Sequence, residues 1–297
     1  MFSFCSSEKR RDKMDWRDHL VIYRARRTSY HDWINNVCNK FNDYLGKNGL
    51  SGAVLSVSGG IDSAVTLALL HHTRNLPDSN LKKIVALYQP IHSSPETRVR
   101  AEELCLVFQQ ELLVIDQTDL HTQIVGKFQG ISQEATAFSK GQLCSYMRTP
   151  ANYYAAQLLG DQGIPALVIG TGNRDEDGYL AYFCKYGDGA VDIQLISSLH
   201  KSEVYSVGRL LNVPESILAA PPSADLWEGQ TDEMELGVPY DFVELYTGYY
   251  LNMGKREQKA MITSLTMESL TEFNLFACLC EKIHYRNLHK LRGVINL

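Results

Sequence analysis

The sequence lacks a membrane span, an excess of charge of either sign and any paired-cysteine motif. Its 297 residues carry a formal net charge of −5, and the isoelectric point is about 6.0. A basic footprint of the kind that binds nucleic acid is therefore absent. No apolar run approaches the roughly 20 residues that a transmembrane helix needs. We expect a chain with neither a nucleic-acid nor a membrane partner.

Cysteine usage points to free thiols and a reducing compartment. The seven cysteines include no C-x-x-C pair, and their spacing fits no disulfide framework. Cys278, Cys280 and His284 hint at a metal site, but at helical spacing the two thiols point in different directions. The first thirty residues are basic yet contain several acids, unlike a transit peptide. We expect a cytoplasmic chain with a flexible basic tail over residues 1–14 and one domain over residues 15–297.

Both of the common phosphate-binding signatures are also missing. The chain contains neither G-x-x-x-x-G-K-[ST] nor G-x-G-x-x-G. It contains instead the run Ser-Gly-Gly-Ile-Asp-Ser over residues 58–63, placed between a strand-like and a helix-like stretch. Glycines at such a turn let the backbone approach an anion, and the helix N-terminus favours negative charge. The predicted phosphate-binding residues are Ser58, Gly59, Gly60 and Ser63.

Asp62 stands out in this run because a carboxylate repels phosphate. A bridging Mg²⁺ would reconcile the two, since Mg²⁺ is usually held by one or two carboxylates together with phosphate oxygens. A tight turn with capping serines is the alternative interpretation of the same residues. Asp62 is therefore a candidate metal ligand.

Apolar strand-like and helix-like segments alternate along the chain. Strands are predicted over residues 53–57, 84–88, 112–115 and 166–169, and helices over 29–46, 63–72, 96–110, 148–159, 202–211, 242–251 and 267–291. Residues 118–145 are polar and poorly periodic. The alternation predicts an α/β fold: a single Rossmann-like, doubly wound domain with a parallel sheet of about five strands flanked by helices. Ligands of such sheets bind at the carboxyl ends of the strands.

A second polar cluster follows the predicted strand 166–169. It reads Gly-Thr-Gly-Asn-Arg-Asp-Glu-Asp-Gly over residues 170–178 and Lys-Tyr-Gly-Asp-Gly over residues 185–189. A solvated charged loop is the alternative interpretation. The 58–63 run resembles the pyrophosphate loop of the ATP pyrophosphatase superfamily. With the second cluster and the runs at 198–204, 222–227 and 231–241, the chain resembles the NAD synthetases from about residue 29 to 291.

This resemblance implies a two-step ligation with ATP as co-substrate and Mg²⁺ as cofactor. The nicotinate carboxylate of deamido-NAD attacks the α-phosphorus of ATP and releases pyrophosphate. Ammonia then attacks the acyl carbon and AMP leaves. Adenylation is needed because a carboxylate is a poor acyl donor. The rivals are another ligase of the superfamily, such as the ammonia-using half of a GMP synthetase, and a non-catalytic nucleotide-binding module.

The resemblance also assigns roles. It implies that Lys201, Ser223 and Thr171 join the 58–63 loop in binding ATP, and that Asp62, Lys201 and Asp188 are catalytic. It implies a second Mg²⁺ carboxylate in the acidic turn. Glu176 is preferred there, and Asp177 is the alternative if no insertion is allowed. The implied substrate-binding residues are Arg148, Lys185, Asp188, Asp192, His289 and Lys290. Asp188 would orient or deprotonate ammonium, or only bind the substrate through a hydrogen bond.

The nitrogen donor and the assembly follow from the same resemblance. Glutamine-dependent members carry a long N-terminal amidase domain, and fewer than thirty residues precede the first core helix here. We therefore expect free ammonia as the donor. Family members form homodimers, and the apolar helices at 29–46 and 242–251 are candidates for that surface.

Overall fold

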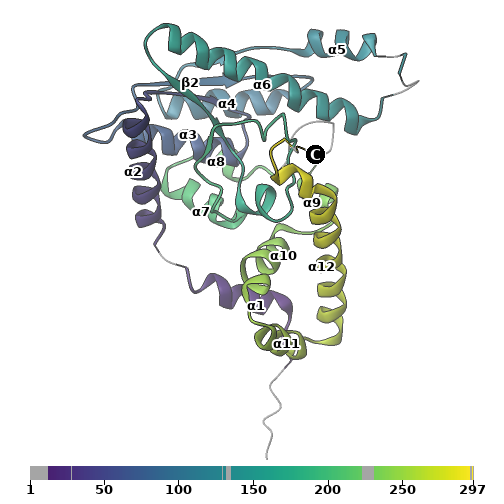
Figure 1. Ribbon diagram of the computed structural model, residues 1–297. Helices are drawn as coiled ribbons and strands as arrows, with labels where there is room; N and C mark the ends of the chain where they lie inside the picture. The colour runs from purple at the N-terminus through teal and green to yellow at the C-terminus, as the bar shows by residue number, and fades with distance from the viewer. Residues whose placement is uncertain are drawn as a thin grey trace, which may run out of the picture.

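A parallel sheet forms the centre of the protein, shown as a computed structural model in Figure 1. The structure describes residues 13–27, 29–128, 130–131, 135–222, 231–294 and 296. The sheet has five strands in the order β3-β2-β1-β4-β5, all parallel where they pair. The strands are β1 (Gly52–Ser56), β2 (Lys83–Tyr88), β3 (Leu112–Val114), β4 (Ala166–Gly170) and β5 (Ile193–Gln194). The predicted fold class is confirmed, although β5 was not among the predicted strands.

The central strand is hydrophobic throughout because both of its faces are buried. Ala53, Val54 and Leu55 have no exposed surface, and Leu55 lies opposite Ala86 on β2 and Ile169 on β4. Successive side chains of a strand point to opposite faces. Ala53 and Leu55 accordingly pack into one hydrophobic cluster and Val54 into another.

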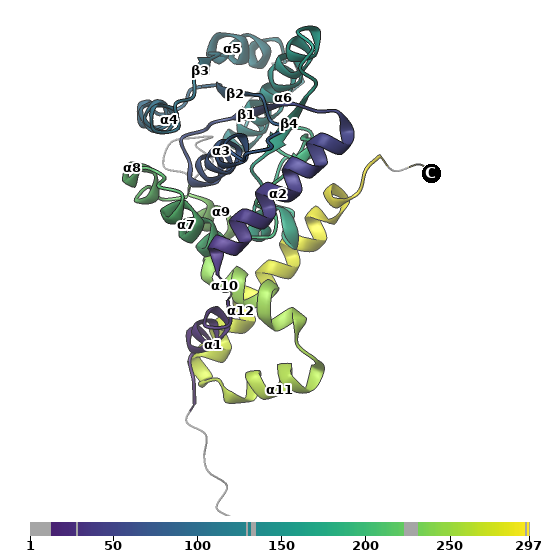
Figure 2. The ribbon, with the colours of Figure 1, turned by 90° about the vertical axis from the view of Figure 1, so that its left-hand side faces the viewer.

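Helices cover both faces of the sheet, as Figure 2 shows in side view. One face carries α2 (Tyr30–Asn48), α3 (Ile61–Arg74), α4 (Pro95–Val107) and α7 (Lys201–Leu210), with the short α8 (Glu215–Leu218) beside them. The other face carries α6 (Ala137–Asp161), against which α5 (Thr118–Lys127) packs. The polar, poorly periodic residues 118–145 include α5 and the first turns of α6, so the helix predicted over 148–159 begins earlier, at Ala137. These turns carry no clear apolar stripe, and Thr136 caps α6 by accepting the backbone N–H of Ser139.

A second group of helices lies below the sheet in Figure 1. It comprises α1 (Trp16–Arg24), α10 (Tyr240–Glu244), the turns η2 (Leu245–Tyr249) and η3 (Tyr250–Asn252), α11 (Lys255–Ser264), α12 (Met267–Asn287) and η4 (Leu288–Leu291). Trp16, Phe242 and Phe273 lie at its centre, with ring centroids 5.3 and 5.2 Å from Phe242. We call this group the helical layer. The short α9 (Asp232–Leu236) packs against this layer through Leu236.

Some of the predicted features involve residues outside, or at the limits of, the described ranges. Residues 1–12 of the predicted tail and Ser223 lie outside the described residues. Met14, at the other end of that tail, pairs with Leu265, and its backbone N–H donates to Ser264 O at 2.9 Å. Among the helices within the described ranges, none combines the length and the apolar character needed to cross a membrane.

The turn after β1 depends on one glycine. Gly59 has a φ of +81°, and a Cβ added there would lie 2.3 Å from the carbonyl oxygen of Thr97. Gly49, which ends α2, has a similar φ of +66° but has nothing within 4 Å of an added Cβ. An alanine at either position would have a strained backbone, but only an alanine at Gly59 would also overlap a neighbouring atom.

This pair gives a matched test of the turn. We expect Gly49→Ala to lower the free energy of unfolding by about 1 kcal/mol, the usual cost of a left-handed alanine. Gly59→Ala should cost at least about 2 kcal/mol, because the Thr97 backbone must also move. Urea unfolding followed by circular dichroism measures both. Equal losses would show that the Thr97 contact does not constrain the turn.

Candidate active site at the switch point of the sheet

The sheet reverses its winding between β1 and β4. From β1 the chain moves outward to β2 and β3, whereas β4 is followed by β5 on the opposite side. Such a reversal leaves a crevice outside the carboxyl ends of the two central strands. The 58–63 loop leaves β1 at this point, and η1 (Arg174–Gly178), a single π-helical turn, follows β4. Both polar clusters found in the sequence therefore meet here.

The loop after β1 is braced by its own serines. The N–H of Ser58 donates to Ser63 Oγ at 3.2 Å, and the N–H of Gly60 donates to Ser58 Oγ at 3.2 Å. Ser63 Oγ in turn donates to Gly60 O at 3.0 Å. Gly60, the N-cap of α3, has no side chain to cap the helix. The loop thus presents a helix N-terminus to the crevice, an arrangement suited to an anion.

One buried lysine connects the two clusters. The ammonium of Lys201, at the start of α7, lies 2.7 Å from Asp62 Oδ2 and 2.8 Å from Glu176 Oε1. Its side chain is 5% exposed. Burial opposes the charge, but the carboxylates of Asp62 and Glu176 outweigh burial and hold the pKa of Lys201 well above its ordinary value. The lysine therefore stays charged between two carboxylates.

Asn173 fixes the relative position of these carboxylates. Its amide nitrogen donates to Asp62 Oδ1 at 3.0 Å. Its amide oxygen accepts the N–H groups of Asp175 at 3.0 Å and Glu176 at 3.1 Å, which caps η1. The side chain is fully buried. Sequence reasoning missed this role, although Asn173 belongs to the Gly-Thr-Gly-Asn run that was singled out.

A third carboxylate reaches the site from α9. The hydroxyl of Tyr240 donates to Glu176 Oε1 at 2.5 Å, and the same oxygen lies 3.1 Å from Asp232 Oδ2. Burial, and then the charge of Glu176, raise the pKa of Asp232 to about 6. Asp232 therefore adds a third negative group to the electrostatic surroundings of Lys201, beyond the two carboxylates that contact its ammonium. Sequence reasoning assigned no role to Asp232 or Tyr240.

The donor set suits a magnesium ion that arrives with a phosphate. Asp62 and Glu176 direct carboxylate oxygens at one shared cation, here the ammonium of Lys201. Among the residues that the structure describes, no three His, Cys, Asp or Glu side chains form a group that would hold a metal ion. Mg²⁺ normally takes one or two carboxylates and completes its shell with water and substrate phosphates. The residues present fit that pattern.

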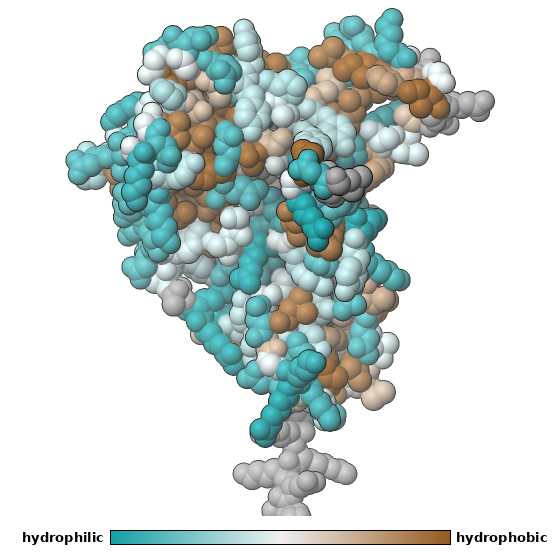
Figure 3. Space-filling model, viewed as in Figure 1, coloured by the Kyte–Doolittle hydropathy of each residue, from teal (hydrophilic) through white to brown (hydrophobic). Residues whose placement is uncertain are grey.

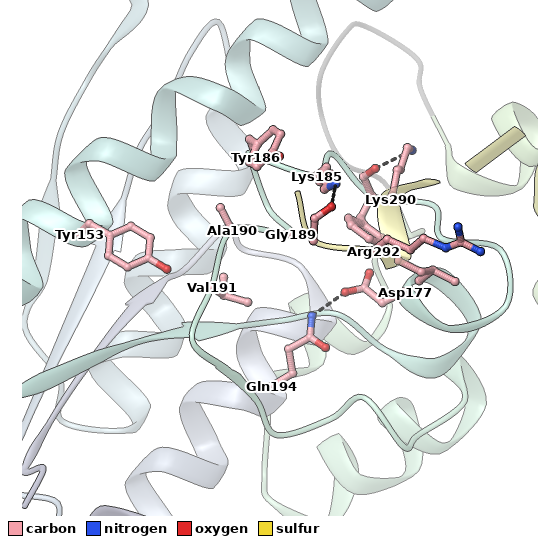
Figure 4. A pocket seen from close by; sticks show the side chains of 13 residues that line it. Tyr153, Asp177, Lys185, Tyr186, Gly189, Ala190, Val191, Gln194, Lys290 and Arg292 are labelled. Atoms are coloured by element: carbon pink, nitrogen blue, oxygen red, sulfur yellow. Dashed lines mark hydrogen bonds between the residues drawn. The ribbon is translucent and has the colours of Figure 1, made fainter. Parts of the chain in front are cut away.

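Asp177 faces a different space from Glu176. Its Oδ2 accepts a hydrogen bond from Gln194 Nε2 at 2.6 Å, and it lines a cavity of about 540 Å³ (Figure 4). Burial, followed by the charges of Asp188 and Glu176, raises the pKa of Asp177 to about 8. Of the two carboxylates left open by the spacing, the structure brings Glu176 next to Asp62.

The cavity gathers two of the predicted substrate-binding lysines. Lys185 Nζ donates to Gly293 O at 3.1 Å, and Lys290 Nζ donates to Phe183 O at 2.7 Å. Both line the cavity with Asp177 and Gln194 (Figure 4). Asp188 lies on the adjoining loop and accepts hydrogen bonds from Ser145 Oγ at 2.7 Å and from the Cys184 N–H at 2.9 Å. Burial of the carboxyl raises the pKa of Asp188, and the hydrogen bonds from Ser145 and Cys184 act in the opposite direction.

Other predicted residues have partners elsewhere. Arg148 Nε donates to Gln89 O at 3.2 Å, beyond the carboxyl end of β2, and Thr171 directly follows β4. Asp192 accepts the N–H of Val168 at 2.8 Å and the hydroxyl of Tyr153 at 3.2 Å, so its carboxylate holds the edge of β4. His289 is exposed. Asp192 and His289 do not line the cavity that contains Lys185 and Lys290.

Comparison with known proteins identifies the family to which the chain is similar. The family model described as NAD synthase matches residues 33–289. The NH(3)-dependent NAD(+) synthetase of Methanococcoides burtonii is 36% identical over 211 residues, which cover 68% of this chain and 74% of that protein. The corresponding protein of Methanosarcina acetivorans is 30% identical over 242 residues, which cover 80% and 88%.

Solved structures give the same result for the fold. An NMN synthetase from Francisella tularensis superposes with a TM-score of 0.73 and 28% identity, covering 91% of this chain and 99% of that one. An NH3-dependent NAD synthetase from Campylobacter jejuni superposes with a TM-score of 0.66 and 22% identity, covering 91% and 100%, and supports the fold alone. With the residues matched by the family model, these similarities show that the chain belongs to the NAD synthase family.

Proposed function

We propose that the protein is an ammonia-dependent NAD synthetase, a ligase that converts deamido-NAD to NAD with ATP. The single observation that carries the proposal is the position of Lys201. Its ammonium joins Asp62 of the loop after β1 to Glu176 of the turn after β4, at the point where such sheets bind ligands. Family membership supports the reaction, and this geometry supports the proposed roles of Lys201, Asp62 and Glu176.

The first step forms the acyl adenylate. An oxygen of the nicotinate carboxylate bonds to the α-phosphorus of ATP, the bond from that phosphorus to the bridging oxygen breaks, and pyrophosphate leaves. Ser58, Gly59, Gly60 and Ser63 would hold the departing phosphates, with Lys201 as a positive charge beside them. Asp62 and Glu176 would hold Mg²⁺, which when bound neutralises phosphate charge. Thr171 belongs to the same proposed site, and so does Ser223, which lies outside the described residues.

The second step forms the amide. The ammonia nitrogen bonds to the acyl carbon and loses a proton, and the bond from that carbon to the AMP oxygen breaks. Asp188 would orient or deprotonate ammonium, and burial raises the pKa of its carboxyl, which makes it a better base. Lys185 and Lys290 bring two positive charges to one cavity and would bind the anionic substrate, with Arg148 as a further contact.

A second candidate function concerns the acceptor. The solved NMN synthetase of Francisella tularensis covers this chain over 91% of its length with a TM-score of 0.73. The same two steps on nicotinate mononucleotide would yield NMN. The chemistry of Lys201, Asp62 and Glu176 serves both acceptors equally, so the size of the substrate distinguishes them.

We also propose a cytoplasmic homodimer. The helices first considered for the interface bury their apolar faces within the chain: Phe41 and Leu45 of α2 pack in the sheet core, and Phe242 packs in the helical layer. On the face in Figure 3, hydrophobic residues gather over α5, where Leu120 and Phe128 are exposed. This surface suits a second copy. Sedimentation equilibrium should give twice the chain mass of 33.5 kDa, and a single-chain mass would contradict the proposal.

A direct assay separates these functions. We expect ATP, Mg²⁺, ammonium and deamido-NAD to yield NAD, AMP and pyrophosphate in equal amounts by chromatography, and glutamine to replace ammonium poorly. Nicotinate mononucleotide is compared at the same concentrations. A higher kcat/KM with the mononucleotide would favour the second candidate. Failure to cleave ATP with either acceptor would contradict both.

Two neighbouring variants test the assignment of the metal carboxylate. Glu176→Gln should lower kcat at least about a hundredfold, because it removes a charge that faces Asp62 and Lys201. Asp177→Asn should retain activity within about threefold, because a carboxyl with a pKa of about 8 is mostly neutral at pH 7 and an amide resembles it. Initial rates over a Mg²⁺ titration measure both. If Asp177→Asn suffers the larger loss, the assignment is reversed.

A further inference from the structure

A buried acid and histidine lie directly behind Lys201. The side chains of Asp175 and His200 are 0% and 1% exposed, and Asp175 Oδ1 lies 2.7 Å from His200 Nδ1. An ionised carboxylate only accepts hydrogen bonds, so Nδ1 carries the proton and donates. Neither residue belongs to the group that faces the crevice. Their burial and short contact therefore need another explanation.

The pair holds the start of α7. The second oxygen of Asp175, Oδ2, accepts the backbone N–H of Lys201 at 2.8 Å. Lys201 is the first residue of the helix, where an N–H has no partner within the helix. His200, the N-cap residue, donates its own N–H to Glu203 Oε2 at 2.8 Å. The backbone of Lys201 is thus anchored by a carboxylate from η1, a segment distant in sequence.

The far side of His200 is packed against the helical layer. The hydroxyl of Tyr23, on α1, lies 3.3 Å from His200 Nε2. A Cβ added to Gly248, on η2, would lie 2.5 Å from the same nitrogen. The ring therefore has little room to turn. Contacts run from α1 through Tyr23, His200 and Asp175 to the backbone of Lys201.

We propose that Asp175 and His200 are positioning residues that keep the ammonium of Lys201 at the phosphate site. This inference rests on the proposed function for the identity of the phosphate, which is that of ATP. Four side-chain torsions lie between the lysine backbone and its ammonium, so a fixed backbone narrows the range of positions that the ammonium reaches. Asp175 also precedes Glu176, and Asn173 accepts the N–H groups of both residues. The buried pair therefore acts directly on Lys201, whereas Asn173 holds the backbone of Glu176.

The test is a double-mutant cycle with Lys201. Four proteins are compared: wild type, Asp175→Ala, Lys201→Met and the double variant. We expect Asp175→Ala to lower kcat and weaken ATP binding about tenfold in the wild-type background, the effect of losing a hydrogen bond to a charged group. In the Lys201→Met background it should have almost no further effect. Calorimetric titration with ATP and Mg²⁺ supplies the binding constant even where turnover is lost.

The same loss in both backgrounds would overturn the proposal, because a general loss of folding would not depend on Lys201. Melting temperatures of all four proteins measure any such loss. The calorimetric measurement also distinguishes failure of the positioning role from failure of the proposed function. Wild-type protein that binds ATP but makes no amide contradicts the proposed function, and the effect of Asp175→Ala on ATP binding can still be compared between the two backgrounds.

Variants of His200 test the hydrogen bond itself. His200→Asn keeps an N–H near the position of Nδ1, whereas His200→Leu keeps only the volume. We expect His200→Asn to retain at least about a third of wild-type kcat and His200→Leu to lose about tenfold. Tyr23→Phe removes only the outer contact at 3.3 Å and should lie near wild type. Equal losses for His200→Asn and His200→Leu would show that ring packing, and not the Asp175 contact, is what matters.

Discussion

The ion pairs of Lys201 with Asp62 and Glu176 are the interaction on which the rest of the site depends. They join three segments that are far apart in sequence: the loop after β1, the turn after β4 and the first residue of α7. A buried charge is tolerated only when it is paired and hydrogen-bonded. The surrounding groups meet that requirement, since Asn173 binds Asp62 and Tyr240 binds Glu176.

The sheet brings those segments together, and the helical layer adds side chains that contact them. The parallel order brings β1 and β4 side by side, so the loops at their carboxyl ends converge. Tyr240 from α10 and Tyr23 from α1 then reach the site from below. The hydrophobic core of the sheet and that of the helical layer therefore serve one site. The first positions the strands, and the second positions the tyrosine side chains that contact the charged groups.

Much of this could be predicted from the sequence, because short-range patterns specify it. The glycines and serines at 58–63 predicted the loop, and the acidic turn at 175–177 predicted carboxylates beside it. The spacing alone left Glu176 and Asp177 open, because the shape of η1 decides which one faces Asp62. Tyr240 and Asp232 were missed because their proximity arises only when α9 and α10 fold back. The two-residue β5 and the start of α6 were not predicted, because neither has a distinctive hydrophobic periodicity.

The place of Lys201 between two carboxylates has a consequence for how ligands enter. The ammonium of Lys201 is the counter-ion that Asp62 and Glu176 share, and under the proposed function a metal–nucleotide complex would bring a second positive charge to the same carboxylates. Nucleotide binding would then exchange one ionic partner of these carboxylates for another. The affinity for nucleotide would accordingly be the difference in free energy between two paired arrangements.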